Sequence, residues 1–269
     1  MHGIEEIEMF KGLWISLQFF TSLPINKQIP MNRDNIDKCI KSIPLLGLFQ
    51  GVLYSLLLYF LIEWTPFSYV AIAFLVWLFT IILTGGIHLD GWMDTSDAFF
   101  SYQNKEKRLE IMNDPRTGAF GVLSVIVLLS GRFLFLYEIT SSLQMLSFMT
   151  IICIPFLSKV VIGSILLTVP AAKEEGLAHF FKQAAKQHTW IIYLMYVLIF
   201  IGFSIFLYRH SMIPLFILVL AAFLCFLFIR RKAVKWFGGI TGDVLGATGE
   251  GTENFLWMTL WLLHYFVMG

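Results

Sequence analysis

The sequence predicts an all-α polytopic membrane protein with about seven transmembrane helices. Of its 269 residues, 58% are apolar and only 14% are charged, whereas about a quarter of the residues in a soluble domain are charged. The apolar residues form long continuous runs and do not alternate with polar ones, which disfavours a transmembrane β-barrel. No internal repeat or low-complexity linker divides the chain, so residues 1–269 are expected to form a single domain.

Seven apolar runs are candidate membrane spans, since a helix needs about 20 residues to cross the hydrocarbon core and all but the last run have 18 or more. They lie at residues 43–63, 67–84, 119–139, 143–169, 190–208, 212–229 and 254–268. Residues 13–23 are also apolar but are too short to span, so we expect them to lie in the interface or to re-enter.

The distribution of basic residues predicts the orientation. The loops at 1–42, 85–118, 170–189 and 230–253 hold 16 of the 19 Lys and Arg residues, whereas the loops on the other side hold only Arg209. Because basic loops stay inside, the first set is expected in the cytoplasm, with the functional site facing the cytosol from the cell (inner) membrane. The net charge of +1 indicates no nucleic-acid partner.

The first group of polar residues follows the second apolar run. Asp90, Asp94 and Asp97 have the spacing i, i+4 and i+7, which places all three on one face of a helix. Three neighbouring carboxylates repel one another and raise one another's pKa, so a cation is expected to neutralise them. The alternative is a solvated helix end, but no basic residue offsets the charges within this segment.

A second acidic group precedes the last apolar run, within the glycine-rich segment 238–253. Asp243 and Glu250 are seven residues apart, and Glu253 follows. Both groups lie on the same predicted side of the membrane. Ligands that are all carboxylates, with no His–Cys pattern, favour Mg²⁺ or Mn²⁺ over Zn²⁺. The pattern therefore indicates phosphoryl or nucleotidyl transfer. Alternatively, Asp243 is a turn residue, and the glutamates mark the water edge of the span.

Basic residues supply the candidate contacts to an anionic substrate. Arg116, in the segment Asp114-Pro115-Arg116, has the planar fork that suits phosphate, although an Asp114–Arg116 pair that closes the loop would explain it equally. Arg132 and Lys159 lie inside apolar runs, where charges usually face a cavity. Together with Lys173 they predict a basic wall. Snorkelling of Lys159 and a surface position of Lys173 are the alternatives.

No other common template accounts for the chain. Walker, HExxH, GxSxG and GxGxxG patterns are absent. The three cysteines, Cys39, Cys153 and Cys225, are scattered and predict neither a disulfide framework nor a zinc site.

Taken in order, several motifs resemble those of the cobalamin synthase (adenosylcobinamide-GDP ribazoletransferase) family along nearly the whole chain. The most specific are the His-Leu-Asp-Gly block at 88–91 and the Thr-Gly-Asp-Val-Leu-Gly-Ala block at 241–247. The others lie at 20–24, 44–47, 85–87, 94–97, 110–114 and 174–177. The chain departs from the family pattern at Ser22 and Ala98, and Lys159 and Lys173 stand where Arg is frequent.

The resemblance implies a late step of cobalamin assembly. The hydroxyl of α-ribazole, or of α-ribazole 5′-phosphate, would attack the phosphorus next to the cobinamide of adenosylcobinamide-GDP, and GMP would leave. The implied cofactor is Mg²⁺, and the lipid bilayer is the other expected partner. Homo-oligomer formation is compatible with the pattern but is indicated by no particular residue.

The resemblance also implies roles for the acidic and basic residues. Asp90, Asp94, Asp97, Asp243, Glu250, Glu253 and Asp114 are the expected metal ligands. One of Asp90, Asp94, Asp97 and Asp243 would act as general base toward the ribose hydroxyl. Arg116 and Lys173, with Arg132 and Lys159 behind them, would bind the pyrophosphate. His88 would orient a carboxylate or donate to the leaving phosphate, although an interfacial histidine without a catalytic task is the alternative.

Three other classes compete with this interpretation. A CDP-alcohol phosphotransferase also uses aspartates at a membrane face, but its Ala-Arg after Asp-Gly is missing from the segment Asp90-Gly91-Trp92-Met93. A transporter would place its acids within the apolar runs, whereas here they lie at the ends. A structural membrane subunit would not need two clusters of acidic residues.

Overall fold

The computed structural model describes residues 2–209 and 212–268, with side chains from Phe10 onward. Within these ranges the chain is helical, and the only β-type contact is one parallel bridge between Ala171 and Ile240. The predicted all-α class is confirmed. The helices are α1 (His2–Phe20), α2 (Arg33–Trp64), α3 (Tyr69–Thr84), α4 (Ile87–Phe100), α5 (Lys105–Met112), α6 (Ala119–Ser141), α7 (Met145–Thr168), α8 (Leu177–Ala184), α9 (Thr189–Leu207), α10 (Met212–Phe237) and α11 (Gly242–Leu263), followed by a π-helix (His264–Met268).

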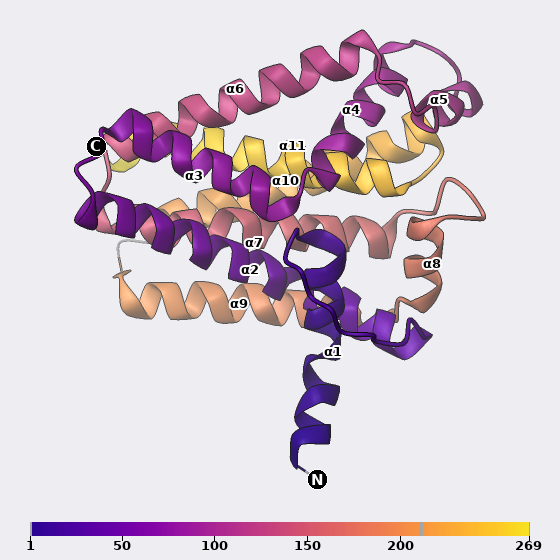
Figure 1. Ribbon diagram of the computed structural model, residues 1–269, viewed down its shortest axis with the longest axis horizontal. Coiled ribbons are helices and arrows are strands. Elements are labelled where there is room, and N and C mark those ends of the chain that lie inside the picture. Colours follow the sequence, from indigo (N-terminus) through magenta and orange to yellow (C-terminus); the bar gives the residue numbers. More distant parts are fainter. Residues whose placement is uncertain (1, 210–211, 269) are drawn as a thin grey trace.

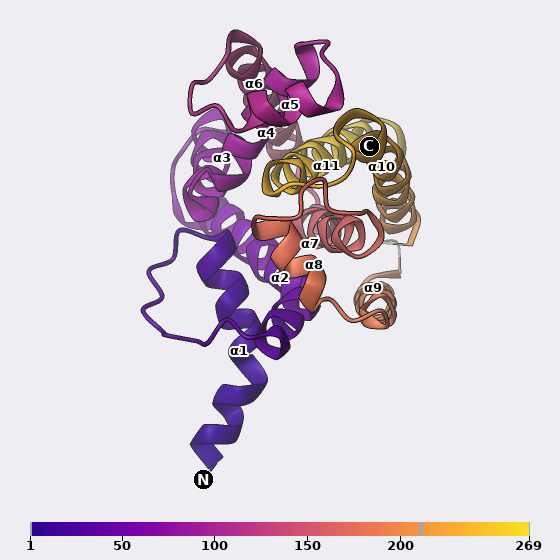
Figure 2. The same cartoon turned by 90° about the vertical axis from the view of Figure 1, so that its right-hand side faces the viewer.

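The long helices run side by side along the longest axis of the molecule, and the short ones gather near one end (Figure 1). Seen from that end, α4 and α5 lie on one side of α11, and α8 and α1 lie on the other (Figure 2). The core is α7, because 78% of its most apolar 18-residue window is buried, compared with 11% for α9. The outer helices therefore present apolar side chains to the surroundings, as a membrane protein does.

Within the part of the chain that the structure describes, five helices are long and apolar enough to cross a membrane, namely α2, α6, α7, α9 and α10. A sixth span results if α3 and α4 are counted together. The polytopic architecture is thus confirmed, with five or six candidate spans where the sequence predicted seven. Two predicted spans account for the difference. The span at 67–84 is α3, which has only 16 residues. The span at 254–268 is the second half of α11, whose first half carries glycines and acids.

A sharp turn between α3 and α4 creates the end face on which the predicted acids lie. The two helix axes differ in direction by 86°. Gly85 and Gly86 form the turn with φ values of 64° and 75°, a backbone region that residues with a Cβ rarely adopt. The glycine pair thus lets α4 cross the end of the bundle instead of extending α3.

The remaining sequence predictions about the fold concern α1 and the cysteines. The predicted interfacial segment 13–23 forms the second half of α1, which packs on α2, and the three residues that follow its end at Phe20. Cys39 and Cys153 are buried free thiols, and Cys225 is a half-buried one.

Candidate functional site

The three predicted carboxylates lie on successive turns of α4, at the end of the bundle. Asp90, Asp94 and Asp97 all fall within α4, so their shared face is confirmed. Asp90 is exposed, whereas Asp94 and Asp97 are half-buried. Helix α4 packs against α11, α6 and α5, and of the three acids Asp90 is the most accessible.

Asp243 joins this group because α11 begins next to α4. The Thr241 hydroxyl accepts a hydrogen bond from the backbone N–H of Val244 at 3.1 Å and starts the helix. Gly91 allows the close approach, since a Cβ at this position would be 2.8 Å from the Asp243 carbonyl oxygen. We call the set Asp90, Asp94, Asp97 and Asp243 the acid face.

The pKa values of two acid-face residues, Asp94 and Asp243, are raised. Partial burial raises the pKa of Asp94 to about 6, with smaller contributions from the negative charges of Asp90, Asp243 and Asp97. Burial also raises the pKa of Asp243, although hydrogen bonds and Lys173 oppose this rise. Carboxylates with raised pKa values are stabilised when a cation neutralises them.

Asp97 has a structural task that the sequence did not reveal. Its two oxygens accept hydrogen bonds from the backbone N–H groups of Gly118 at 2.7 Å and Gly121 at 2.8 Å. These are free donors at the start of α6, where the helix dipole also favours a negative charge. Asp97 therefore anchors α6 to α4. Both of its oxygens already accept hydrogen bonds, so a metal ion bound by Asp97 would have to share them with these backbone groups.

Lys173 is the cation of the site. The loop after α7 pairs with the segment before α11, because Ala172 donates to the Ile240 carbonyl and Ile240 donates to the Pro170 carbonyl, each at 2.9 Å. Lys173 in turn donates to Asn113 Oδ1 at 2.7 Å, at the end of α5. The positive charge of Lys173 acts to lower the pKa of Asp243. Asn113 is a site residue that sequence reasoning missed, since no motif marks an exposed asparagine.

The Asp114–Arg116 pair closes its own loop. Arg116 Nε donates to Asp114 Oδ1 at 2.9 Å, and Arg116 NH2 donates to Oδ2 at 2.6 Å. These hydrogen bonds lower the pKa of Asp114 to about 2. Both Asp114 oxygens are engaged, so the geometry favours the loop-closing interpretation over metal binding by Asp114. Arg116 remains exposed, and its other guanidinium N–H groups are directed to solvent.

A second charged group lies inside the bundle, separate from the acid face. Arg132 of α6 pairs with Glu250 of α11 at 2.7 Å, and the two side chains are only 3% and 5% exposed. Glu253 interacts electrostatically with Arg132 and with Lys159 of α7. Because seven residues separate Asp243 from Glu250, this interior network lies about 10 Å deeper along α11.

The interior network changes the expected roles of its members. Glu250 and Glu253 were predicted as metal ligands, but here buried cations neutralise them. Arg132 and Lys159 were predicted to bind substrate, but they are 3% and 2% exposed and face these glutamates. His88 is buried 3.5 Å from Lys159 Nζ, on the bundle side of α4, so it does not reach the acid face as a proton donor.

The donor set of the acid face fits a divalent cation that is only partly coordinated by protein. Among the described residues, no three Asp, Glu, His or Cys side chains are arranged as a preformed metal cage. Mg²⁺ commonly uses one or two carboxylates and completes its shell with water and substrate phosphates. Asp90, Asp94 and Asp243 offer such oxygens, and Lys173 lies beside them.

The chain is similar to known proteins along nearly its whole length. Residues 12–261 match the family model described as cobalamin-5-phosphate synthase. A protein of Geobacillus sp. (strain WCH70) named adenosylcobinamide-GDP ribazoletransferase is 38% identical, over 96% of this chain and 98% of its own length. Proteins with the same name from Geobacillus thermodenitrificans and Acinetobacter baumannii are 39% and 33% identical, over 97% and 95% of this chain and 99% and 98% of their own. No solved structure matches the chain significantly. The match along nearly the whole length shows that this chain belongs to the cobalamin-5-phosphate synthase family.

Proposed function

We propose that this protein is an adenosylcobinamide-GDP ribazoletransferase that uses the acid face as its active site. The activity is the one named for its relatives. The observation that carries the assignment of the site is the convergence of four carboxylates and Lys173 from three separate segments at one end of a membrane bundle. Such a site suits a donor whose reacting group is a pyrophosphate.

The reaction is a displacement at phosphorus. The hydroxyl of α-ribazole, or of its 5′-phosphate, forms a bond to the phosphorus next to the cobinamide. The bond from this phosphorus to the oxygen of the GMP phosphate breaks, and GMP leaves with the electron pair. The hydroxyl proton goes to a carboxylate. Asp94 is suited to accept it, because a carboxylate with a pKa of about 6 is a stronger base than an ordinary aspartate.

Asp90 and Asp243 are the residues that would hold Mg²⁺, which commonly uses one or two protein carboxylates, and this leaves Asp94 free to accept the hydroxyl proton. When bound, the ion would neutralise charge on the pyrophosphate and offset the repulsion within the acid face. Lys173 would contact the same group, since Asn113 holds its ammonium and its charge acts on Asp243. Arg116 is positioned on the adjoining loop, where its exposed guanidinium can reach an incoming phosphate.

The acid face is assigned to the cytoplasmic side of the cell membrane. The segments that hold 16 of the 19 Lys and Arg residues all belong to the end of the bundle that carries α4 and α5. Soluble nucleotide donors would then reach the site directly.

The test is turnover by the chain in detergent or vesicles supplied with adenosylcobinamide-GDP and α-ribazole. We expect GMP release with cobalamin formation, and we expect both to require Mg²⁺. An Asp94→Asn variant should insert and fold normally but form no product. If the folded wild-type chain supplied with metal forms no cobalamin, the proposed activity is wrong. If Asp94→Asn is fully active, the activity stands, but the acid face is not its site.

A further inference from the structure

A large apolar groove lies beneath α4, between α6, α10 and α11, with a volume of about 1040 Å³. Its floor is buried and includes Leu128 of α6 and Phe237 of α10. Its rim is exposed. Leu123 and Val127 of α6 are 58% and 72% exposed, and Phe228 of α10 is 55% exposed. The groove therefore opens sideways between two membrane-spanning helices, toward the surroundings that lipid would occupy.

The groove is not part of the acid face. Successive residues of a helix are turned by 100°, so the groove-lining Trp92, Ser96 and Phe99 are on the opposite side of α4 from Asp90 and Asp94. Its lining is almost entirely apolar. A polar nucleotide would find few partners there.

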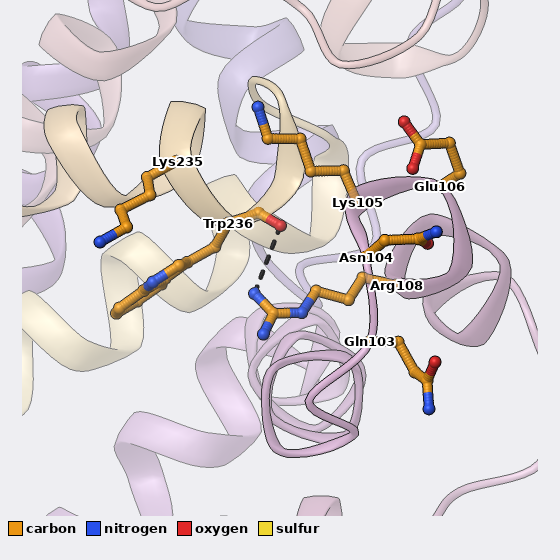
Figure 3. A pocket seen from close by; sticks show the side chains of 7 residues that line it. All are labelled: Gln103, Asn104, Lys105, Glu106, Arg108, Lys235 and Trp236. Atoms are coloured by element: carbon orange, nitrogen blue, oxygen red, sulfur yellow. Dashed lines mark hydrogen bonds between the residues drawn. The ribbon is translucent and has the colours of Figure 1, made fainter.

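A basic pocket adjoins the groove at the same end of the bundle. Its volume is about 550 Å³, and Lys105 and Arg108 of α5 and Lys235 of α10 line it together with Glu106. In Figure 3 the side chains of Lys105, Arg108 and Lys235 lie near Trp236, whose carbonyl accepts a hydrogen bond from Arg108, and Glu106 lies farther away. Trp236 lines both cavities. Lys232 lines the groove and lies 4.9 Å from the centre of the Trp236 ring, so the cations continue from the pocket into the groove.

Three hydrogen-bonding groups without partners belong to residues that line the two cavities. Within the described residues, Trp92 Nε1 and Thr95 Oγ1 are buried in the groove lining and have no hydrogen-bond partner, and neither has Arg108 Nε of the basic pocket. Buried donors of this kind normally have partners. These atoms are enclosed by neighbouring side chains, and a small shift of those side chains would bring them into contact with oxygen acceptors of an amphiphile that occupies the cavities.

We propose that the groove and the basic pocket together form a binding site for an anionic phospholipid. The acyl chain would occupy the apolar groove, the ester oxygens would lie near Trp92 and Thr95, and the phosphate would lie between Lys105, Arg108 and Lys235. The charge in the pocket, three cations against Glu106, selects an anionic headgroup over a zwitterionic one. The sideways opening selects a bilayer lipid over a soluble ligand.

Native mass spectrometry of the purified full-length chain tests the site, with phosphatidylglycerol and phosphatidylcholine of identical acyl chains as probes. We expect one molecule of phosphatidylglycerol to bind preferentially. A cation near a membrane surface contributes roughly a fivefold effect on affinity for anionic lipid. Lys235→Gln should therefore weaken phosphatidylglycerol binding about fivefold, and adding Lys105→Gln should weaken it to about one thirtieth in total. Lys235→Arg should restore it.

The matched control is Arg231→Gln, because Arg231 is exposed on the same helix and lines neither cavity. It should leave phosphatidylglycerol binding nearly unchanged. Equal binding of the two lipids would overturn the proposal, and so would an equal loss in Arg231→Gln and Lys235→Gln, which would indicate a diffuse surface charge. A dimer mass that excludes lipid would show that a second copy covers the groove, and it would also overturn the proposal. The lipid preference, the effects of the variants and the oligomer mass are all measured without catalytic turnover.

Discussion

The buried Arg132–Glu250 pair offers the sharpest test of how the charged residues are divided between structure and chemistry. Arg132→Met removes the cation but leaves the Glu250 carboxylate in place with 5% exposure. Breaking a buried ion pair from one side costs about 3–5 kcal/mol, because the remaining charge is uncompensated. For a chain of this size, that corresponds to a fall in unfolding temperature on the order of 10 °C.

The double variant Arg132→Met/Glu250→Gln separates a structural pair from a metal site. Replacing both charges removes the uncompensated carboxylate, so we expect the double variant to regain most of the lost stability. The assay is thermal unfolding in detergent, followed by intrinsic fluorescence, for the wild type, both single variants and the double variant under identical conditions.

Two results would refute this reasoning. If Arg132→Met lowered the unfolding temperature by no more than a typical exposed substitution, the pair would not be important for the fold. If instead Glu250→Gln were fully stable but lost its Mg²⁺ dependence of turnover, Glu250 would be a metal ligand, as the sequence alone suggested.

Four further predictions concern the acid face and Lys173. Asp94→Asn should raise the unfolding temperature of the metal-free protein at pH 7 while abolishing turnover, because it removes one of several repelling carboxylates; an unchanged or lower unfolding temperature would contradict this. The raised pKa of Asp94 means that the folded state binds more protons than the unfolded state between about pH 4 and pH 6. Its contribution to stability should therefore be lost as the pH rises through this window, and the Asp94→Asn variant should lack that part of the pH dependence of unfolding. Asp97→Ala should destabilise the protein by about 1 kcal/mol through loss of the α6 cap, and a denaturant or thermal titration that shows no loss would exclude this role. Lys173→Gln should raise the KM for adenosylcobinamide-GDP more than it lowers kcat, and Lys173→Arg should recover most of the loss; equal effects of both substitutions would place Lys173 outside the site.

The sequence predicted the acid face well because its information is local. The spacing of Asp90, Asp94 and Asp97 follows from helix periodicity alone, and the glycine pair at 85–86 marks the turn that exposes them. The apolar runs likewise predicted the long helices. The approach of Asp243 could be anticipated only from its place on the same side of the membrane.

Long-range pairing explains what the sequence did not predict. Nothing near Glu250 in sequence indicates that Arg132, 118 residues away, would neutralise it. Similarly, Asp97 meets Gly118 and Gly121 only because α6 begins beside α4. A carboxylate pattern shows that compensation is needed, but whether a metal, a cation or a helix N-terminus supplies it depends on the tertiary structure.

Helix α11 connects the interior network with the acid face, and this gives the buried charges a role in the geometry of the site. Asp243 is in its first turn, and Glu250 and Glu253 follow two and three turns later. Rotating α11 by one residue would turn it by 100° and carry Glu250 away from Arg132, leaving two unpaired charges in the bundle. The same rotation would move Asp243 away from Asp90 and Asp94. Because the first displacement is so costly, the interior network fixes the rotation of α11, and with it the position of Asp243 beside the carboxylates of α4.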